Sequence, residues 1–229
     1  MLKKFRSIVG ALIYLSVLTR PDISYAVSAV AQFMSNPNEE HEKAAKRTLR
    51  YLKKYPEFSV KYFQTGKGLH LHGYVDSNFL GDIDSKSVSG YFFLSGNGLI
   101  SWTSKRQTTI ATSTGHAETN AYFLAVKECI YLRKIASEFA WGEQINGKPT
   151  EIIGDNSACI ELVKQPLRNV QRTKHWDMEW NWLHEQRENL KVFVPMQVQT
   201  SLMLADMLTK PLGKIAHHQA IKKLKLCDV

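Results

Sequence analysis

Hydrophobic residues recur at helical spacing along the first 55 residues of the chain. Apolar positions three and four residues apart predict a helix over residues 5–18, a second over 23–34 after a break at Pro21, and a third over 39–55 that ends at Pro56. The opening third of the chain is therefore predicted to be entirely helical.

The hydrophobic period changes to that of strands near Ser59. Strand-like runs lie at 60–75, with a turn at 66–68, and then at 88–94 and 99–104, joined by the turn residues 95–98. Short sequence separation and the hairpin signal predict that the strands around Asp76, Tyr91 and Ile100 form an antiparallel meander.

Strands and helices alternate after residue 112. Thr112–Thr114 caps a long predicted helix, strands follow at 151–154 and 192–194, with the second ended by Pro195, and helices lie after 155 and over 172–189. Thr200 and Ser201 begin a last predicted helix that Pro211 ends. The pattern predicts an α/β fold, a five-stranded mixed sheet with helices packed on it. We expect a helical segment at 1–65, the sheet domain at 66–213 and a basic tail at 214–229.

The composition indicates the kind of partner and the cellular compartment to expect. The 229 residues carry a net charge of +9, which favours a polyanionic partner, nucleic acid before membrane. The basic residues of 39–55 are either a phosphate-binding surface or a solvated helix face. Three scattered cysteines argue against a disulfide framework and for a reducing compartment, and no apolar run is long enough to cross a bilayer. We expect a soluble intracellular protein with no membrane partner.

Four acids on separate predicted elements carry the candidate chemistry: Asp76, Glu118, Asp155 and Asp206. Phosphodiester hydrolysis is served by two divalent ions about 3.5–4 Å apart, held by hard carboxylate oxygens. Each acid also has a structural alternative. Asp76 could cap a turn, Glu118 could face solvent and Asp155 could be a helix N-cap. Asp206 lies in an apolar helix, where an acid is costly unless it is paired or metal-bound.

Seven blocks of the chain, in order, resemble the ribonuclease H domain of copia-type retrotransposon Pol polyproteins. They are Gly73–Asp82, Ser87–Phe93, Ile100–Gln107, Ser113–Glu118, Gly154–Ala158, Arg172–His175 and Leu204–Leu212. The opening helices resemble the segment that joins the reverse transcriptase to that domain. The resemblance implies that the chain begins partway through a polyprotein, as a fragment or a decayed genomic copy.

That resemblance implies a ribonuclease H-like fold and an enzyme that cuts the RNA strand of an RNA–DNA hybrid with two Mg²⁺ ions, for which Mn²⁺ can substitute. The four acids match the family's metal-binding positions. His175 matches a histidine that helps product release in this superfamily, although capping or packing would also explain it. The implied partners are the hybrid and the reverse-transcriptase domain of the same polyprotein, with no small-molecule cofactor. The implied location is a cytoplasmic virus-like particle or the nucleus.

For other residues near these blocks, the sequence gives weaker evidence of a functional role. His116 lies beside Glu118, while Asp82 and Asp84 suit turns. Lys105 and Arg106 are either phosphate contacts or solvated loop charges. Two further hypotheses stay open: a catalytically idle, basic nucleic-acid-binding remnant, and an integrase-like or resolvase-like nuclease of the same fold.

Overall fold

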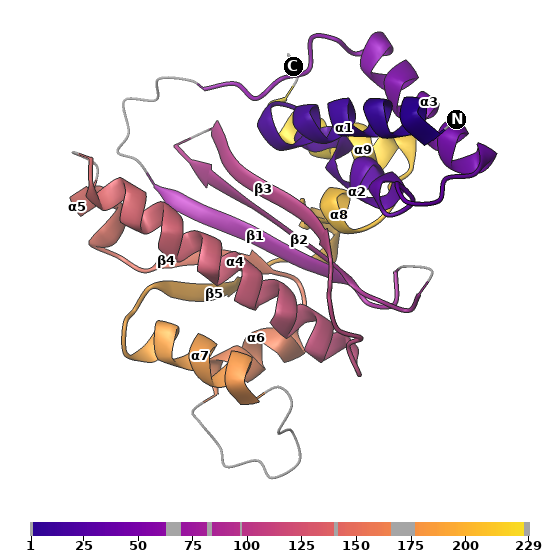
Figure 1. Ribbon diagram of the computed structural model, residues 1–229. Helices are drawn as coiled ribbons and strands as arrows, with labels where there is room; N and C mark the ends of the chain where they lie inside the picture. The colour runs from indigo at the N-terminus through magenta and orange to yellow at the C-terminus, as the bar shows by residue number, and fades with distance from the viewer. Residues whose placement is uncertain are drawn as a thin grey trace.

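A computed structural model of the chain describes residues 2–62, 70–81, 84–96, 98–139, 142–165 and 177–226. Its centre is a five-stranded sheet in the order β3-β2-β1-β4-β5 (Figure 1). The strands are β1 Leu71–Asn78, β2 Val88–Ser95, β3 Gly98–Arg106, β4 Thr150–Gly154 and β5 Phe193–Gln197. Strands β1, β2 and β3 pair antiparallel, whereas β4 pairs parallel with β1 and with β5. The predicted mixed sheet with an antiparallel meander is confirmed.

Helices precede, interrupt and follow the sheet. They are α1 Leu2–Leu18, η1 Pro21–Ile23, α2 Ser24–Ala31, α3 Glu39–Lys54, α4 Thr114–Ser137, α5 Gly142–Asn146, α6 Ser157–Lys164, α7 Asp177–Glu188, η2 Thr200–Leu202, α8 Asp206–Thr209 and α9 Lys214–Lys223. Every helix in the described parts of the chain is too short or too polar to cross a bilayer.

The two faces of the sheet carry separate cores because successive strand residues point to opposite sides. Phe93 of β2 packs with residues of α4, α6 and α7, whereas its neighbour Phe92 packs with residues of α8 and α9. Both phenylalanines are fully buried. Figure 1 shows α4 lying along the sheet, with α6 and α7 beside β4 and β5.

The opening helices form a third core that docks onto the rest of the molecule. Phe5, Val9 and Leu12 of α1 pack against Ile23 and Val27. The indole Nε1 of Trp102 in β3 donates to the carbonyl of Ser16 at 2.6 Å, and His217 hydrogen-bonds to the carbonyl of Asp22 at 2.9 Å. The helical segment is thus attached to both β3 and α9.

Several predicted boundaries were wrong. The helix expected over 23–34 is a 3-10 turn at Pro21–Ile23 followed by α2. The first strand begins at Leu71; residues 60–62 are not strand, and 63–69 lie outside the described residues. Pro195 lies inside β5 rather than ending it, because β5 is an edge strand where a missing N–H is tolerated.

The C-terminal part of the chain also differs from the expected single helix and tail. The helix expected before Pro211 is split into η2 and α8, because the extended backbone of Met203 separates them. Residues 214–223, expected in a basic tail, form α9, and Ala220 and Ile221 are buried in the core beside α8. The division into domains at 65 and 213 stays a prediction.

Candidate metal centre

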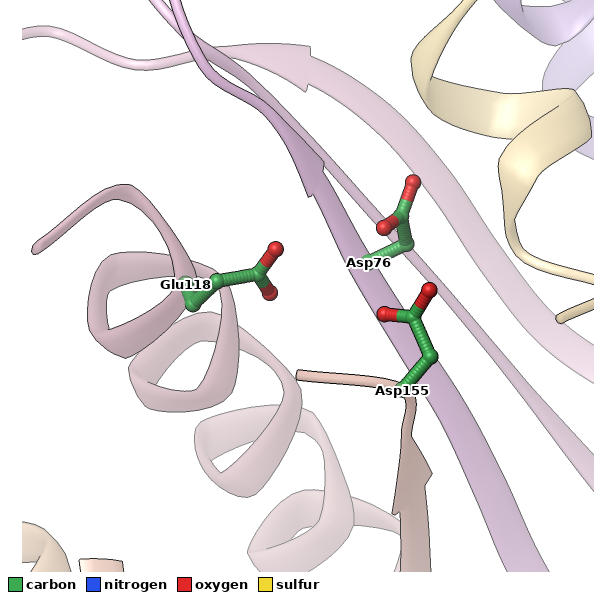
Figure 2. A group of neighbouring side chains, drawn as sticks. All are labelled: Asp76, Glu118 and Asp155. Carbon is green, nitrogen blue, oxygen red and sulfur yellow. The ribbon is translucent and has the colours of Figure 1, made fainter. Parts of the chain in front are cut away.

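Three carboxylates converge at one edge of the sheet. Asp76, Glu118 and Asp155 each offer one oxygen, and these three oxygens lie within 4.8 Å of one another (Figure 2). Asp76 and Glu118 are buried, and Asp155 is half-buried. The strand β1, the helix α4 and the end of β4 therefore contribute one acid each.

Strand pairing aligns two of these acids. In the parallel pair of β1 and β4, Tyr74 lies opposite Ile153. Asp76 and Asp155 each follow two residues later, so the shared register brings them to the same level at the carboxyl ends of both strands. Tyr74 packs in the core on the α8 side, and the period of two places Asp76 on that side as well.

Close packing of α4 brings the third acid to the strand ends. Ser113 caps α4 as predicted, accepting from the backbone N–H of His116 at 3.1 Å. Glu118 lies in the second turn, and Tyr122 is one turn further along the same face. A Cβ on Gly154 would lie 2.5 Å from the Tyr122 hydroxyl. Glycine just before Asp155 therefore lets α4 approach β4 closely.

The structural alternatives for these three acids are wrong. Asn156, not Asp155, caps α6, accepting from the N–H of Cys159 at 3.0 Å. Glu118 does not face solvent, because only 5% of it is exposed. Asp76 lies within β1, and its carboxylate accepts a hydrogen bond from the hydroxyl of Thr209 rather than from a turn N–H of any residue that the structure describes.

Asp206, the fourth predicted acid, lies beside the three converging carboxylates rather than among them. It is the first residue of α8, and its carboxylate is 2.8 Å from the ammonium of Lys210 one turn later. The same ammonium is 3.9 Å from the carboxylate of Asp76. Lys210 thus links the three-acid group to Asp206.

Electrostatics in this group favour a bound cation. Burial raises the pKa of Asp76 to about 7, although the Thr209 hydroxyl and the charge of Lys210 lower it in part. Burial also raises the pKa of Glu118 to about 8, and the charge of Asp76 adds to the rise. Carboxylate oxygens are the ligands that Mg²⁺ prefers, and a cation would stabilise their ionised forms. The donor set therefore fits a divalent ion.

Sequence reasoning overlooked Thr209 and Lys210. The spacing of four between Asp206 and Lys210 on a helix was an available signal for their ion pair. The contact of Thr209 with Asp76 joins residues that are 133 positions apart in the sequence. A local sequence pattern therefore could not predict it.

The remaining predicted site residues have varied outcomes. His175 and Asp82 lie outside the described residues. His116 is buried near the start of α4, where its Nδ1 is 3.3 Å from the backbone N–H of Thr112. Arg106 forms an ion pair with Asp84 at 2.8 Å.

Comparison with known structures agrees with this architecture. A foamy viral protease–reverse transcriptase, solved in complex with an RNA/DNA hybrid, superposes with a TM-score of 0.55 at 15% sequence identity. The match covers 93% of this chain and 26% of that chain. The sheet order and its helices define a ribonuclease H-like fold, as predicted.

Comparison with known sequences identifies the family, although the chain matches no protein-family model. The Pol polyprotein of transposon TNT 1-94 from Nicotiana tabacum is 38% identical over 209 residues, 90% of this chain. That of transposon RE1 from Arabidopsis thaliana is 36% identical over 227 residues, 99% of this chain. The chain spans about 15% of the length of either relative. It belongs to the copia-type retrotransposon Pol polyproteins and corresponds to their ribonuclease H region with the connecting segment before it.

Proposed function

We propose that this chain is a metal-dependent endonuclease that cuts the RNA strand of RNA–DNA hybrids during retrotransposon reverse transcription. The observation that carries the proposal is the convergence of Asp76, Glu118 and Asp155 from three elements at one edge of a ribonuclease H-like sheet. Homology to the Pol polyproteins of transposons supports it.

In this proposal the three carboxylates hold divalent cations, two Mg²⁺ with Mn²⁺ as a substitute, and Asp206 is the fourth ligand. When bound, such ions activate water at neutral pH and offset the charge that develops on the leaving 3′ oxygen. The hydroxyl of Thr209 orients Asp76, and Lys210 holds Asp206 close by. His175 remains a predicted aid to product release.

Substrate binding in this proposal relies on shape and charge. A hybrid is distinguished by the 2′-hydroxyls of its RNA strand and by groove width rather than by base sequence. The net charge of +9 favours attraction to phosphates. The reverse-transcriptase domain of the same polyprotein is the proposed protein partner.

A strand-specific cleavage assay tests the proposal. The purified chain is incubated with a hybrid labelled on either the RNA or the DNA strand, with Mg²⁺ or with EDTA. We expect the RNA strand to shorten in Mg²⁺, the DNA strand to stay intact, and EDTA to stop the reaction. Binding without cleavage in both Mg²⁺ and Mn²⁺ would instead support the catalytically idle remnant.

A further inference from the structure

A basic cleft lies between the opening helices and the C-terminal helices. Its volume is about 740 Å³, and its walls come from α2 and α3 on one side and from the segment 207–218, including α9, on the other. Figure 1 shows these helices grouped together beyond the β3 edge of the sheet. Lys210 lines the cleft and also contacts Asp76 and Asp206, so the cleft opens beside the candidate metal centre.

Cationic side chains outnumber acidic ones in the lining of this cleft. Arg47, Arg50 and Lys54 come from α3, and the spacing of three and four residues places them on one helix face. Lys210 and Lys214 face them from the other wall. The single acid in the lining, among the residues that the structure describes, is Asp22, which is 2.7 Å from the guanidinium of Arg20.

The first and second halves of α3 differ in how their charges are balanced. Lys43 and Lys46, which do not line the cleft, pair with Glu40 and Glu42 at 2.7 Å each. In the second half, along the cleft, Arg47 and Arg50 are exposed and have no ion-pair partner within the described part of the chain. Uncompensated charge in a concave site favours an anionic ligand.

Aromatic side chains lie between these cations. Tyr25, Tyr51 and Tyr55 line the cleft. Tyr51 is held by a 2.8 Å hydrogen bond to the carboxylate of Asp22, and Tyr55 stacks on Phe58 with ring centroids 4.8 Å apart. A positive groove with fixed aromatic rings is the combination that binds unpaired nucleic-acid strands.

We propose that this cleft binds an unpaired nucleic-acid strand that continues from the hybrid at the candidate metal centre. The position of that hybrid rests on the proposed function, whereas binding of the strand by the cleft does not. The sequence left two alternatives for the basic residues of α3, a phosphate-binding surface or a solvated helix face. The proposal favours the phosphate-binding surface.

Fluorescence anisotropy with matched probes tests the proposal. The probes are a blunt RNA–DNA hybrid and the same hybrid with a ten-nucleotide single-stranded extension at one end or the other, all measured in EDTA so that no cleavage occurs. The variants are Arg47→Gln/Arg50→Gln and, from the opposite wall, Lys214→Gln. The matched control is Lys43→Gln/Lys46→Gln, which removes the same charge from the first half of the same helix, outside the cleft lining.

The wild-type chain should bind one extended probe about tenfold more tightly than the blunt hybrid, because several added phosphates are neutralised. The double arginine variant should lose most of that gain. For this variant, the slope of log K against the logarithm of salt concentration should become shallower by about 1.4. This corresponds to roughly 0.7 for each of two single-strand phosphates that are no longer neutralised. Lys214→Gln should lose part of the gain, and the lysine control should keep it.

The proposal would be overturned if the extension adds no affinity at either end of the hybrid. That result is expected if the cleft binds a protein segment instead of a nucleic-acid strand. An equal loss in the lysine control would also overturn it, because general charge would then explain the binding. Since Arg47 and Arg50 are exposed, the urea unfolding midpoint of the double arginine variant should match that of the wild-type protein. Failure of the proposed function would appear separately, as a blunt hybrid that is never cut in Mg²⁺.

Discussion

Replacing Gly90 with alanine tests how α8 is held against the sheet beside the three carboxylates. Gly90 pairs with Asp76 across β1 and β2. A Cβ at this position would lie 2.7 Å from Cγ2 of Thr209 and 2.8 Å from Cβ of Leu208. Carbon atoms pack at about 3.5–4.0 Å, so α8 or β2 must shift by roughly 1 Å.

The expected cost follows from that crowding. Leu208 and Thr209 are both fully buried and have little room to move, and overpacking of this kind destabilises a core by about 1–3 kcal/mol. The shift also moves the hydroxyl that donates to Asp76. A displacement of about 1 Å near reacting groups can reduce a rate on the order of 100-fold.

Urea unfolding followed by tryptophan fluorescence measures the first effect, and hybrid cleavage measures the second. Gly10→Ala is the matched control: a Cβ there meets nothing within 4 Å, and alanine in a helix should stabilise the protein by about 0.5–1 kcal/mol. If Gly90→Ala unfolds at the wild-type urea concentration, the described contact between α8 and β2 is wrong.

Three further predictions concern the electrostatics of the site. Because the pKa of Asp76 rises to about 7 and that of Glu118 to about 8 on folding, the folded state keeps protons that the unfolded state loses near pH 4. The melting temperature of the metal-free protein should therefore fall as pH rises from about 4 to 8; calorimetry that finds a rise would contradict this. Thr209→Val removes a hydrogen-bond donor to a buried carboxylate and should lower the free energy of unfolding at pH 8 by about 1–3 kcal/mol, measured with urea; an unchanged value would contradict the contact. Lys210→Met removes a cation that lies beside two acids, so Mg²⁺ should raise the melting temperature more in this variant than in the wild type; a smaller rise would show that Lys210 does not offset their charge.

Local patterns predicted the elements that carry the acids. The hairpin residues before Gly98, the cap at Ser113 and the strand ending at Gly154 each express a preference of a few neighbouring residues. Asp76 and Asp155 could be placed at strand ends for that reason. The alignment of Asp76 with Asp155 depends on the parallel pairing of β1 with β4. A sequence pattern can suggest that pairing only once the whole fold is assumed.

Features that depend on distant contacts were not predictable in this way. Thr209 reaches Asp76 only because α8 packs on β1 and β2. Pro195 is accepted in a strand because that strand lies at the sheet edge. The amphipathic stretch 214–223 becomes a packed helix because Phe58 and Leu208 supply an apolar partner for Ile221. In each case tertiary burial overrides or completes a weak local signal.

The central claim is that the converging carboxylates bind metal and cleave RNA. It is tested most directly by the cleavage rate of a labelled hybrid in Mg²⁺ for Asp155→Asn, which keeps the shape of the side chain and removes its charge. Glu161→Gln is the control, since that side chain is 65% exposed on α6, with the ammonium of Lys164 3.7 Å away. We predict that Asp155→Asn binds the hybrid but cuts the RNA more than about 100-fold more slowly, while Glu161→Gln cuts at the wild-type rate. Cleavage by Asp155→Asn at the wild-type rate would contradict the account.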